Sequence, residues 1–158
     1  MSNKRVKNAT IIQYRDIKFK SKLEATFYKM LLQAGFNPQY ESKTYVLWNG
    51  FKPTIPFYTK DRKTKDLKLS TDKLRDITYT PDFSFNYNGL EIIIEAKGKE
   101  NDVYPIKRKL FRKILEKLNP KPLVFEVFNK KQLLSAIEII KSYEAISTEN
   151  TEANTTTS

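Results

Sequence analysis

The segment TPDFSFNYNGLEIIIEAKG, residues 80–98, consists of two runs of strand-forming residues separated by Asn88-Gly89. Asn-Gly between two such runs is the strongest short-range signal for a β-hairpin with a two-residue type I′ turn. If this dipeptide forms the turn, Asp82 lies directly opposite Glu95. A longer loop would slide the pairing, and a slip of one residue would turn one strand's side chains to the other face.

The predicted hairpin brings two carboxylates and a lysine together at one end. Lys97 shares a face with Glu95 because side chains alternate along a strand. Two opposed acidic groups repel each other unless a cation lies between them, and oxygen ligands suit Mg²⁺ or Mn²⁺. We therefore predict a metal site in which a bound ion can acidify water and polarise a phosphoryl oxygen, beside a lysine that stabilises developing charge. A structural ion pair between Asp82 and Lys97, with Glu95 solvated, is the alternative.

The composition limits the chemistry that this chain can perform. Its 158 residues suit one domain with a sizeable core. The net charge of +11 favours a polyanionic partner, most simply nucleic acid. The absence of histidine and cysteine excludes His-based triads, thiol catalysis and disulfides. No apolar run of about 18 residues predicts a membrane span, and the first residues lack an apolar signal core.

Hydrophobic periodicity predicts one domain over residues 11–144, between a basic flexible arm (residues 1–10) and a disordered polar tail (residues 145–158). A first helix begins after Ser21 and ends near Gly35, where Ser21 and Glu24 have the spacing of a capping box. A second helix has Pro105 in its first turn. A short apolar strand at residues 122–128 and a third helix at residues 130–143 follow.

The order of these elements predicts an α/β fold, in which a mixed β-sheet is flanked by helices. A strand is expected at residues 40–48, and a short strand or hairpin is expected before the first helix. The strand at 122–128 follows a crossover helix, so it should lie parallel to the strand that ends near Lys97.

Residues 49–76 form a basic insertion with no clear periodicity. It reads either as a basic loop or as an extended hairpin, and a solvated insertion without a partner is the simplest alternative. Seven of its basic residues crowd into the stretch from residue 60 to residue 75: Lys60, Arg62, Lys63, Lys65, Lys68, Lys73 and Arg75.

The sequence resembles the PD-(D/E)XK nuclease superfamily, in which one strand ends in an acidic residue and the next carries (D/E)-X-K. Pro81-Asp82 and Glu95-Ala96-Lys97 match the two halves of that pattern. Within the superfamily, residues 19–98 are most similar to the phage endonuclease I group of small phage endonucleases, which resolve four-way (Holliday) junctions. The insertion is longer than in that group, and the C-terminal third differs from it.

The resemblance implies a restriction-endonuclease-like sheet in a single nuclease domain. It also implies that Glu24, Asp82 and Glu95 bind Mg²⁺ or Mn²⁺ and that Lys97 serves the nucleophile or the transition state. Glu24 has a second explanation, because a capping box alone accounts for a glutamate three residues after Ser21.

Four basic residues are candidates for phosphate contacts, which would position nucleic acid without reading its sequence. A plain solvated helix face is the alternative for those on the second helix. The four residues are Lys20, Lys107, Arg108 and Arg112.

These observations predict a Mg²⁺-dependent DNA endonuclease that acts on branched DNA in phage recombination or replication. The protein is expected to be intracellular and cytoplasmic, in the host cytoplasm if it is phage-encoded. Two cuts on one junction would require a homodimer. The alternatives are a nuclease of ordinary duplex DNA, of restriction or transposition type, and a non-catalytic nucleic-acid-binding protein.

Overall fold

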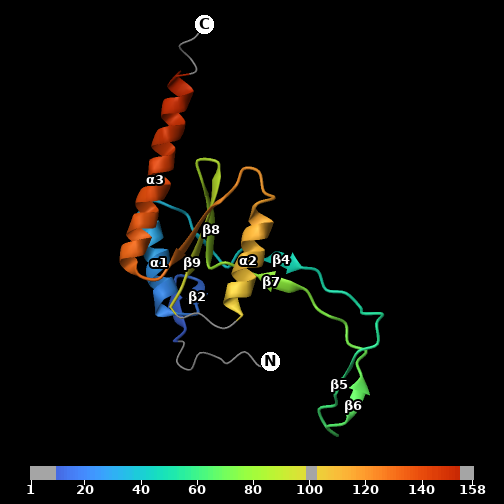
Figure 1. The fold of residues 1–158 in the computed structure, drawn as a ribbon. Helices are drawn as coiled ribbons and strands as arrows, with labels where there is room; N and C mark the ends of the chain where they lie inside the picture. Colours follow the sequence, from blue (N-terminus) through green and yellow to red (C-terminus); the bar gives the residue numbers. More distant parts are fainter. Residues whose placement is uncertain (1–9, 99–102, 154–158) are drawn as a thin grey trace.

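A computed structural model describes residues 10–98 and 103–153 (Figure 1). The N-terminal residues 1–9 of the predicted flexible arm and residues 154–158 of the predicted tail lie outside this range. The elements are β1 (Ile12–Tyr14), β2 (Ile17–Phe19), α1 (Lys22–Gln33), β3 (Gln39–Tyr40), β4 (Tyr45–Trp48), β5 (Tyr58–Lys60), β6 (Leu67–Leu69), β7 (Ile77–Tyr79), β8 (Phe83–Tyr87), β9 (Leu90–Ala96), α2 (Tyr104–Leu115), β10 (Leu123–Val127) and α3 (Lys130–Ala153).

The centre of the fold is a mixed four-stranded sheet in the order β10-β9-β8-β3. β8 is antiparallel to both β9 and β3, whereas β10 runs parallel to β9. The parallel pair is joined through α2, as expected for a crossover connection. The predicted α/β class with a mixed sheet flanked by helices is confirmed.

Helices cover both faces of this sheet because β9 is apolar on both sides. Ile92 and Ile94 pack in a core with residues of α1 and α3, and Ile93 packs on the other side against Phe111 and Leu115 of α2. Figure 1 shows α1 and α3 on one side of the β8–β9 hairpin and α2 on the other. A strand buried on both faces reads as a continuous apolar run, which explains the three consecutive isoleucines.

The predicted strand at residues 40–48 is wrong as a single element. It is divided between β3, which pairs with β8, and β4, which pairs with β7 in a separate two-stranded ribbon. The division follows Glu41, whose φ of 45° lies in the left-handed region and turns the chain out of the sheet. β4 therefore leaves the sheet and lies over α2.

Residues 49–76, here called the projecting hairpin, extend from the β4–β7 ribbon and carry the paired strands β5 and β6. The extended-hairpin reading of this insertion is therefore confirmed, and Figure 1 shows the hairpin reaching away from the sheet.

The last helix is longer than its periodicity predicts. α3 continues to Ala153, so the backbone of residues 145–153 is helical where the sequence predicts a polar tail. Among the described residues, no helix has both the length and the apolarity needed to cross a membrane.

Candidate functional site

The β8–β9 hairpin has the register that its turn predicts. Phe83 pairs with Ile94 and Tyr87 with Leu90. The turn residues, Asn88-Gly89, have φ values of 53° and 79°, which is the pair of positive angles that a type I′ turn requires. One further step along this register places Asp82 opposite Glu95.

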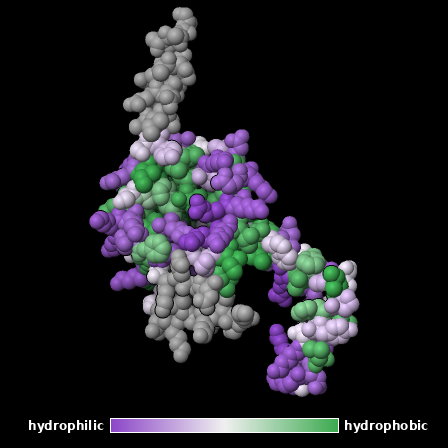
Figure 2. Space-filling model, in the orientation of Figure 1, coloured by the Kyte–Doolittle hydropathy of each residue, from purple (hydrophilic) through white to green (hydrophobic). Residues whose placement is uncertain are grey.

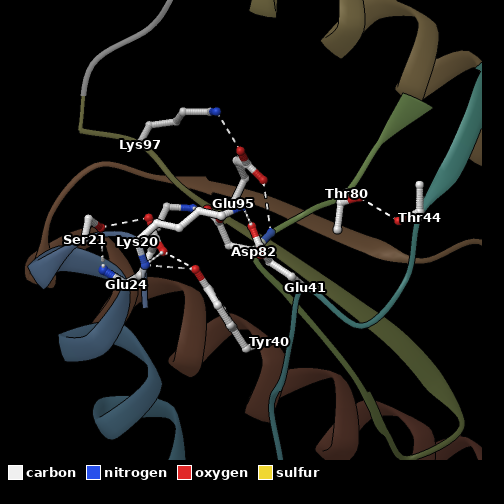
Figure 3. A network of polar contacts seen from close by, with 11 residues as sticks. Lys20, Ser21, Glu24, Tyr40, Glu41, Thr44, Thr80, Asp82, Glu95 and Lys97 are labelled. Atoms are coloured by element: carbon white, nitrogen blue, oxygen red, sulfur yellow. Dashed lines mark hydrogen bonds and ion pairs between the residues drawn. The ribbon is translucent and has the colours of Figure 1, made fainter. Parts of the chain in front are cut away.

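Backbone hydrogen bonds hold the two carboxylates in place (Figure 3). The N–H of Asp82 donates to Oε2 of Glu95 at 3.2 Å, and the N–H of Ala96 donates to Oδ2 of Asp82 at 2.7 Å. Glu95 is only 8% exposed. Charged carboxylates are almost never buried in this way without a partner, so the pair requires a source of positive charge.

The negative charge concentrated here shifts the acidity of the site. Burial, followed by the charges of Glu95 and Glu24, raises the pKa of Asp82 to about 8. Burial and the adjacent Glu95 carboxylate also raise the pKa of the Tyr79 hydroxyl above its ordinary value. Perturbed carboxyl groups of this kind cluster at functional sites. The site is thus locally acidic in a strongly basic chain.

Lys97 provides a positive charge beside this pair. Its Nζ lies 2.6 Å from Oε1 of Glu95 and 3.4 Å from the centre of the Tyr104 ring. The alternative expectation of an Asp82–Lys97 pair with a solvated Glu95 is therefore wrong, since the lysine pairs with a buried Glu95. The aromatic ring and the carboxylate together hold the ammonium beside the acidic pair.

Tyr79 and Tyr104 also belong to this site, although neither is predicted from the sequence to have a role in it. Tyr79 ends β7, and the hydroxyl of Tyr104 at the start of α2 donates to Oε1 of Glu126 at 3.1 Å. Lys97 directly follows β9 whereas Tyr104 begins α2, so the period of no single strand or helix relates the two. The only signal is its position next to Pro105, the expected helix start.

Glu24 has the capping role that its spacing indicates. Ser21 is the N-cap of α1 and accepts a hydrogen bond from the Glu24 N–H, while Ser21 Oγ donates to Glu24 Oε1 at 2.8 Å. Glu24 Oε2 accepts from the Lys20 N–H and the Tyr40 hydroxyl. The charge of Glu24 nevertheless contributes to the raised pKa of Asp82, so the cap of α1 lies near the site. The predicted role of Glu24 as a metal ligand stays a prediction.

Glu41 joins this cluster from the end of β3, and it too is missing from the residues predicted from sequence. Its N–H donates to the carbonyl of Asp82 at 2.8 Å, and its carboxylate pairs with Lys20 Nζ. The positive φ of Glu41 places it here, and hydrophobic periodicity cannot predict that backbone angle. In Figure 3, Lys20 extends between Glu24 and Glu41.

The other basic residues predicted to bind nucleic acid lie on α2, on the side of the sheet that the acidic pair faces. Lys107 Nζ donates to the carbonyl of Thr78 at 3.0 Å, and Arg108 pairs with Glu126 at 3.3 Å. Arg108 and Arg112 line a cavity of about 600 Å³ between α2 and β10. Their predicted phosphate contacts, and that of Lys20, stay predictions.

The donors present fit a hard divalent cation. Among the described residues, no three or more acidic, histidine or cysteine side chains are grouped to hold a metal ion. Magnesium, however, is usually bound through one or two carboxylates together with waters and substrate phosphates. Asp82 and Glu95 supply such a pair, and their mutual repulsion is what a cation would relieve.

Comparison with known proteins gives a family match that lies across this site. The family described as "Protein of unknown function (DUF1064)" matches residues 4–131. The chain belongs to this family. No curated protein and no solved structure matches the chain. In this DUF1064 chain the matched region includes all the acidic side chains described above, together with Lys97 and Tyr104.

Proposed function

We propose that this protein is a metal-dependent DNA endonuclease of PD-(D/E)XK type. The observation that carries the proposal is the pair formed by the half-buried Asp82 and the buried Glu95, with Lys97 fixed beside it. Pro81-Asp82 and Glu95-Ala96-Lys97 match the sequence pattern, and the hairpin register puts the three charged side chains at one end of the sheet. The basic composition suits a phosphodiester substrate.

The proposed roles follow from the chemistry of each side chain. Asp82 and Glu95 would hold Mg²⁺ or Mn²⁺, which would supply an acidified water and polarise a phosphoryl oxygen. Lys97 would place its ammonium next to the charge that develops on the phosphate. Tyr104 positions Lys97, because the ammonium lies over its ring. Glu24 would act through its charge on Asp82 or as a further ligand.

We further propose branched DNA as the preferred substrate and a homodimer as the active form. Resolution of a four-way junction needs two cuts and hence two active sites. The resemblance of residues 19–98 to junction-resolving phage endonucleases supports this finer proposal. Light scattering would measure the mass in solution, and a strict monomer, with and without a junction, would contradict it.

Cleavage assays test the proposal directly. A four-way junction, a linear duplex with the same arm sequences and a single strand would be incubated with Mg²⁺, with Mn²⁺ and with EDTA. Glu95→Gln is the test variant. Glu91→Gln is its matched control, because Glu91 lies on the same strand and also pairs with a lysine, Lys43.

The outcomes separate the alternatives. No cutting of any substrate in either metal would refute the endonuclease, whereas equal rates on junction and duplex would refute only the preference for branches. A second candidate, a non-catalytic nucleic-acid-binding protein, is favoured by one observation: Lys97 pairs with Glu95 at 2.6 Å and can balance its charge. That candidate expects binding of DNA without cleavage.

A further inference from the structure

The projecting hairpin ends in a compact basic tip, residues 60–68. Asp61 organises the turn, since its Oδ1 accepts from the N–H groups of Lys63 and Thr64 at 2.8 and 3.1 Å. Its Oδ2 pairs with Lys68 at 3.0 Å. These bonds hold the backbone of the tip in one conformation, so its basic side chains project from a formed loop.

Three cations at the tip remain available to a ligand. Lys60, Arg62 and Lys63 are exposed, and none of them forms an ion pair within the part of the chain that the structure describes. Lys60 and Lys63 lie with Lys68 around a hollow of about 750 Å³. In Figure 2 hydrophilic side chains gather at this end of the hairpin, at the lower right of the view.

The hairpin grows out of the segment that carries the candidate site. Its return strand enters β7, which ends at Tyr79, three residues before Asp82. Several contacts fasten the root. The Gly50 N–H donates to Asp76 Oδ1 at 2.7 Å, the Leu74 N–H donates to the Phe51 carbonyl at 2.9 Å, and Lys107 Nζ donates to the Thr78 carbonyl. A ligand that lies on the site and extends along the hairpin would therefore reach the tip.

We propose that the tip of the projecting hairpin binds the phosphate backbone of the DNA duplex that flanks the cut site. The inference rests on the proposed function, because it takes DNA as the occupant of the site. A two-stranded β-ribbon fits the major groove of B-DNA, and unpaired lysines and arginines are the usual phosphate contacts. Eight lysines and arginines against four aspartates in residues 49–76 match the charge of that partner.

The rival occupant is a protein, because the stem of the hairpin is apolar. Ile55 is 81% exposed and Phe57 is 64% exposed, and apolar surface of this kind marks protein interfaces. The charge at the tip favours DNA, whereas the stem alone would suit a second copy of this chain. DNA would contact the basic tip of the hairpin, whereas a second copy of the chain would contact its apolar stem.

The reach of the hairpin sets the length of the probe. Lys60 is twelve residues further along the chain than Trp48, and at about 3.3 Å per residue this stretch spans at most ~40 Å. This is slightly more than one turn of B-DNA, ~34 Å. Two duplexes are needed, one ending close to the cut site and one continuing for about 12 base pairs beyond it.

The test measures affinity for both duplexes by fluorescence anisotropy over a range of salt concentrations, with Glu95→Gln in every protein to prevent cutting. The tip variant carries Lys60→Gln, Arg62→Gln and Lys63→Gln. Its matched control removes three exposed charges from α3, through Lys130→Gln, Lys131→Gln and Lys141→Gln.

On the long duplex, log K should fall less steeply with log salt for the tip variant. The slope should become less negative by about 2–3, because each lost phosphate contact changes it by ~0.9. The control should change it by less than 1. The gain in affinity from the short to the long duplex should also disappear in the tip variant alone.

An unchanged slope and an unchanged length dependence in the tip variant would overturn the inference. Loss of self-association on Ile55→Ser with Phe57→Ser, while DNA binding is unaffected, would also overturn it, since the hairpin would then be a protein interface. The endonuclease proposal is judged separately, by cleavage of the short duplex with Glu95 intact. Cleavage by the tip variant with an unchanged slope would refute only the role of the tip.

Discussion

Asp82 and Glu95 face each other across the β8–β9 hairpin, and the N–H of Asp82 donates a 3.2 Å hydrogen bond to Oε2 of Glu95. Two acidic residues are thus joined by the backbone of one and the side chain of the other. This contact fixes the position of Glu95 while leaving its charge to be balanced by Lys97 or by a cation. Substitution of either carboxylate, or of the groups that support the pair, should therefore have measurable effects.

Glu95→Gln should abolish metal-dependent cleavage, with a loss of at least about 10²–10³ in rate, and it should leave folding intact. The amide oxygen can still accept from the Asp82 N–H, and the substitution removes a buried charge. Initial cleavage rates and thermal unfolding would check both effects. A variant as active as Glu91→Gln would contradict the assignment.

Lys97→Met should destabilise the protein by about 2–3 kcal/mol, because it leaves Glu95 buried without its cation. The side chains of this pair are only 14% and 10% exposed, so solvent screens them little. Urea unfolding at neutral pH would measure the loss. Lys43→Met removes the more exposed partner of Glu91 and serves as the control, which should lose much less.

The stability of the metal-free protein should fall as the pH rises from about 4 to beyond 8. The pKa of Asp82 is raised from 3.8 to about 8 in the folded state. Between these values the folded state holds a proton that the unfolded chain has released, so the free energy of unfolding decreases with pH. The stability that this proton confers is complete below pH 4 and is lost through pH 8.

Melting temperatures in EDTA at pH 6 and pH 9 would measure this dependence, with Asp82→Asn as the comparison. The variant should show a smaller drop than the natural sequence, because the amide does not titrate. Mg²⁺ should stabilise the natural sequence more at pH 9 than at pH 6, since the ion and the proton compete for the same carboxylate. An equal pH dependence in both proteins would show that Asp82 is not the group responsible.

Ser21→Ala should cost about 1 kcal/mol, because α1 loses the hydroxyl that accepts from the Glu24 N–H. Cleavage should be largely retained, since Glu24 keeps its contacts with the Lys20 N–H and Tyr40. Glu24→Ala should lose stability and cleavage together. Full cleavage by Glu24→Ala, measured well below its melting temperature, would leave Glu24 as a helix cap only.

Gly50→Ala should disrupt the root of the projecting hairpin. A Cβ on Gly50 would lie 2.1 Å from the carbonyl oxygen of Leu74. The two segments of the hairpin would therefore have to move apart, which would strain the hydrogen bond from the Gly50 N–H to Asp76. Faster proteolysis within residues 49–76 would report this opening. Gly98→Ala is the control, because a Cβ there meets no atom within 4 Å; equal proteolysis of both variants would contradict the close approach.

The features that were predicted from sequence are those encoded by short-range patterns. The Asn88-Gly89 turn specifies its own backbone angles and hence the register that places Asp82 opposite Glu95. The Ser21 cap likewise depends on side chains within three residues of one another. Turn formation, helix capping and strand alternation depend on residues close together in the chain, so they can be predicted from one sequence.

The features that were missed depend on contacts between distant segments. Periodicity treats residues 40–48 as one strand, because it contains no sign that Glu41 takes a positive φ and sends β4 toward α2. The insertion at 49–76 has no clear period, so its extended-hairpin form was only one of the alternatives. Tertiary packing, rather than local propensity, decides such cases.

The chain's own pattern of residues sufficed to establish a mixed α/β fold, a hairpin with two opposed carboxylates, and a chemistry without histidine or cysteine. The folded structure added which partners those carboxylates have. Alternation along the strands allows Lys97 to pair with either Asp82 or Glu95. In the folded structure Lys97 pairs with Glu95, and the ring of Tyr104 from α2 lies against its ammonium group. The physical reason is that burial and charge pairing are properties of the assembled core, where segments far apart in the chain exclude water together.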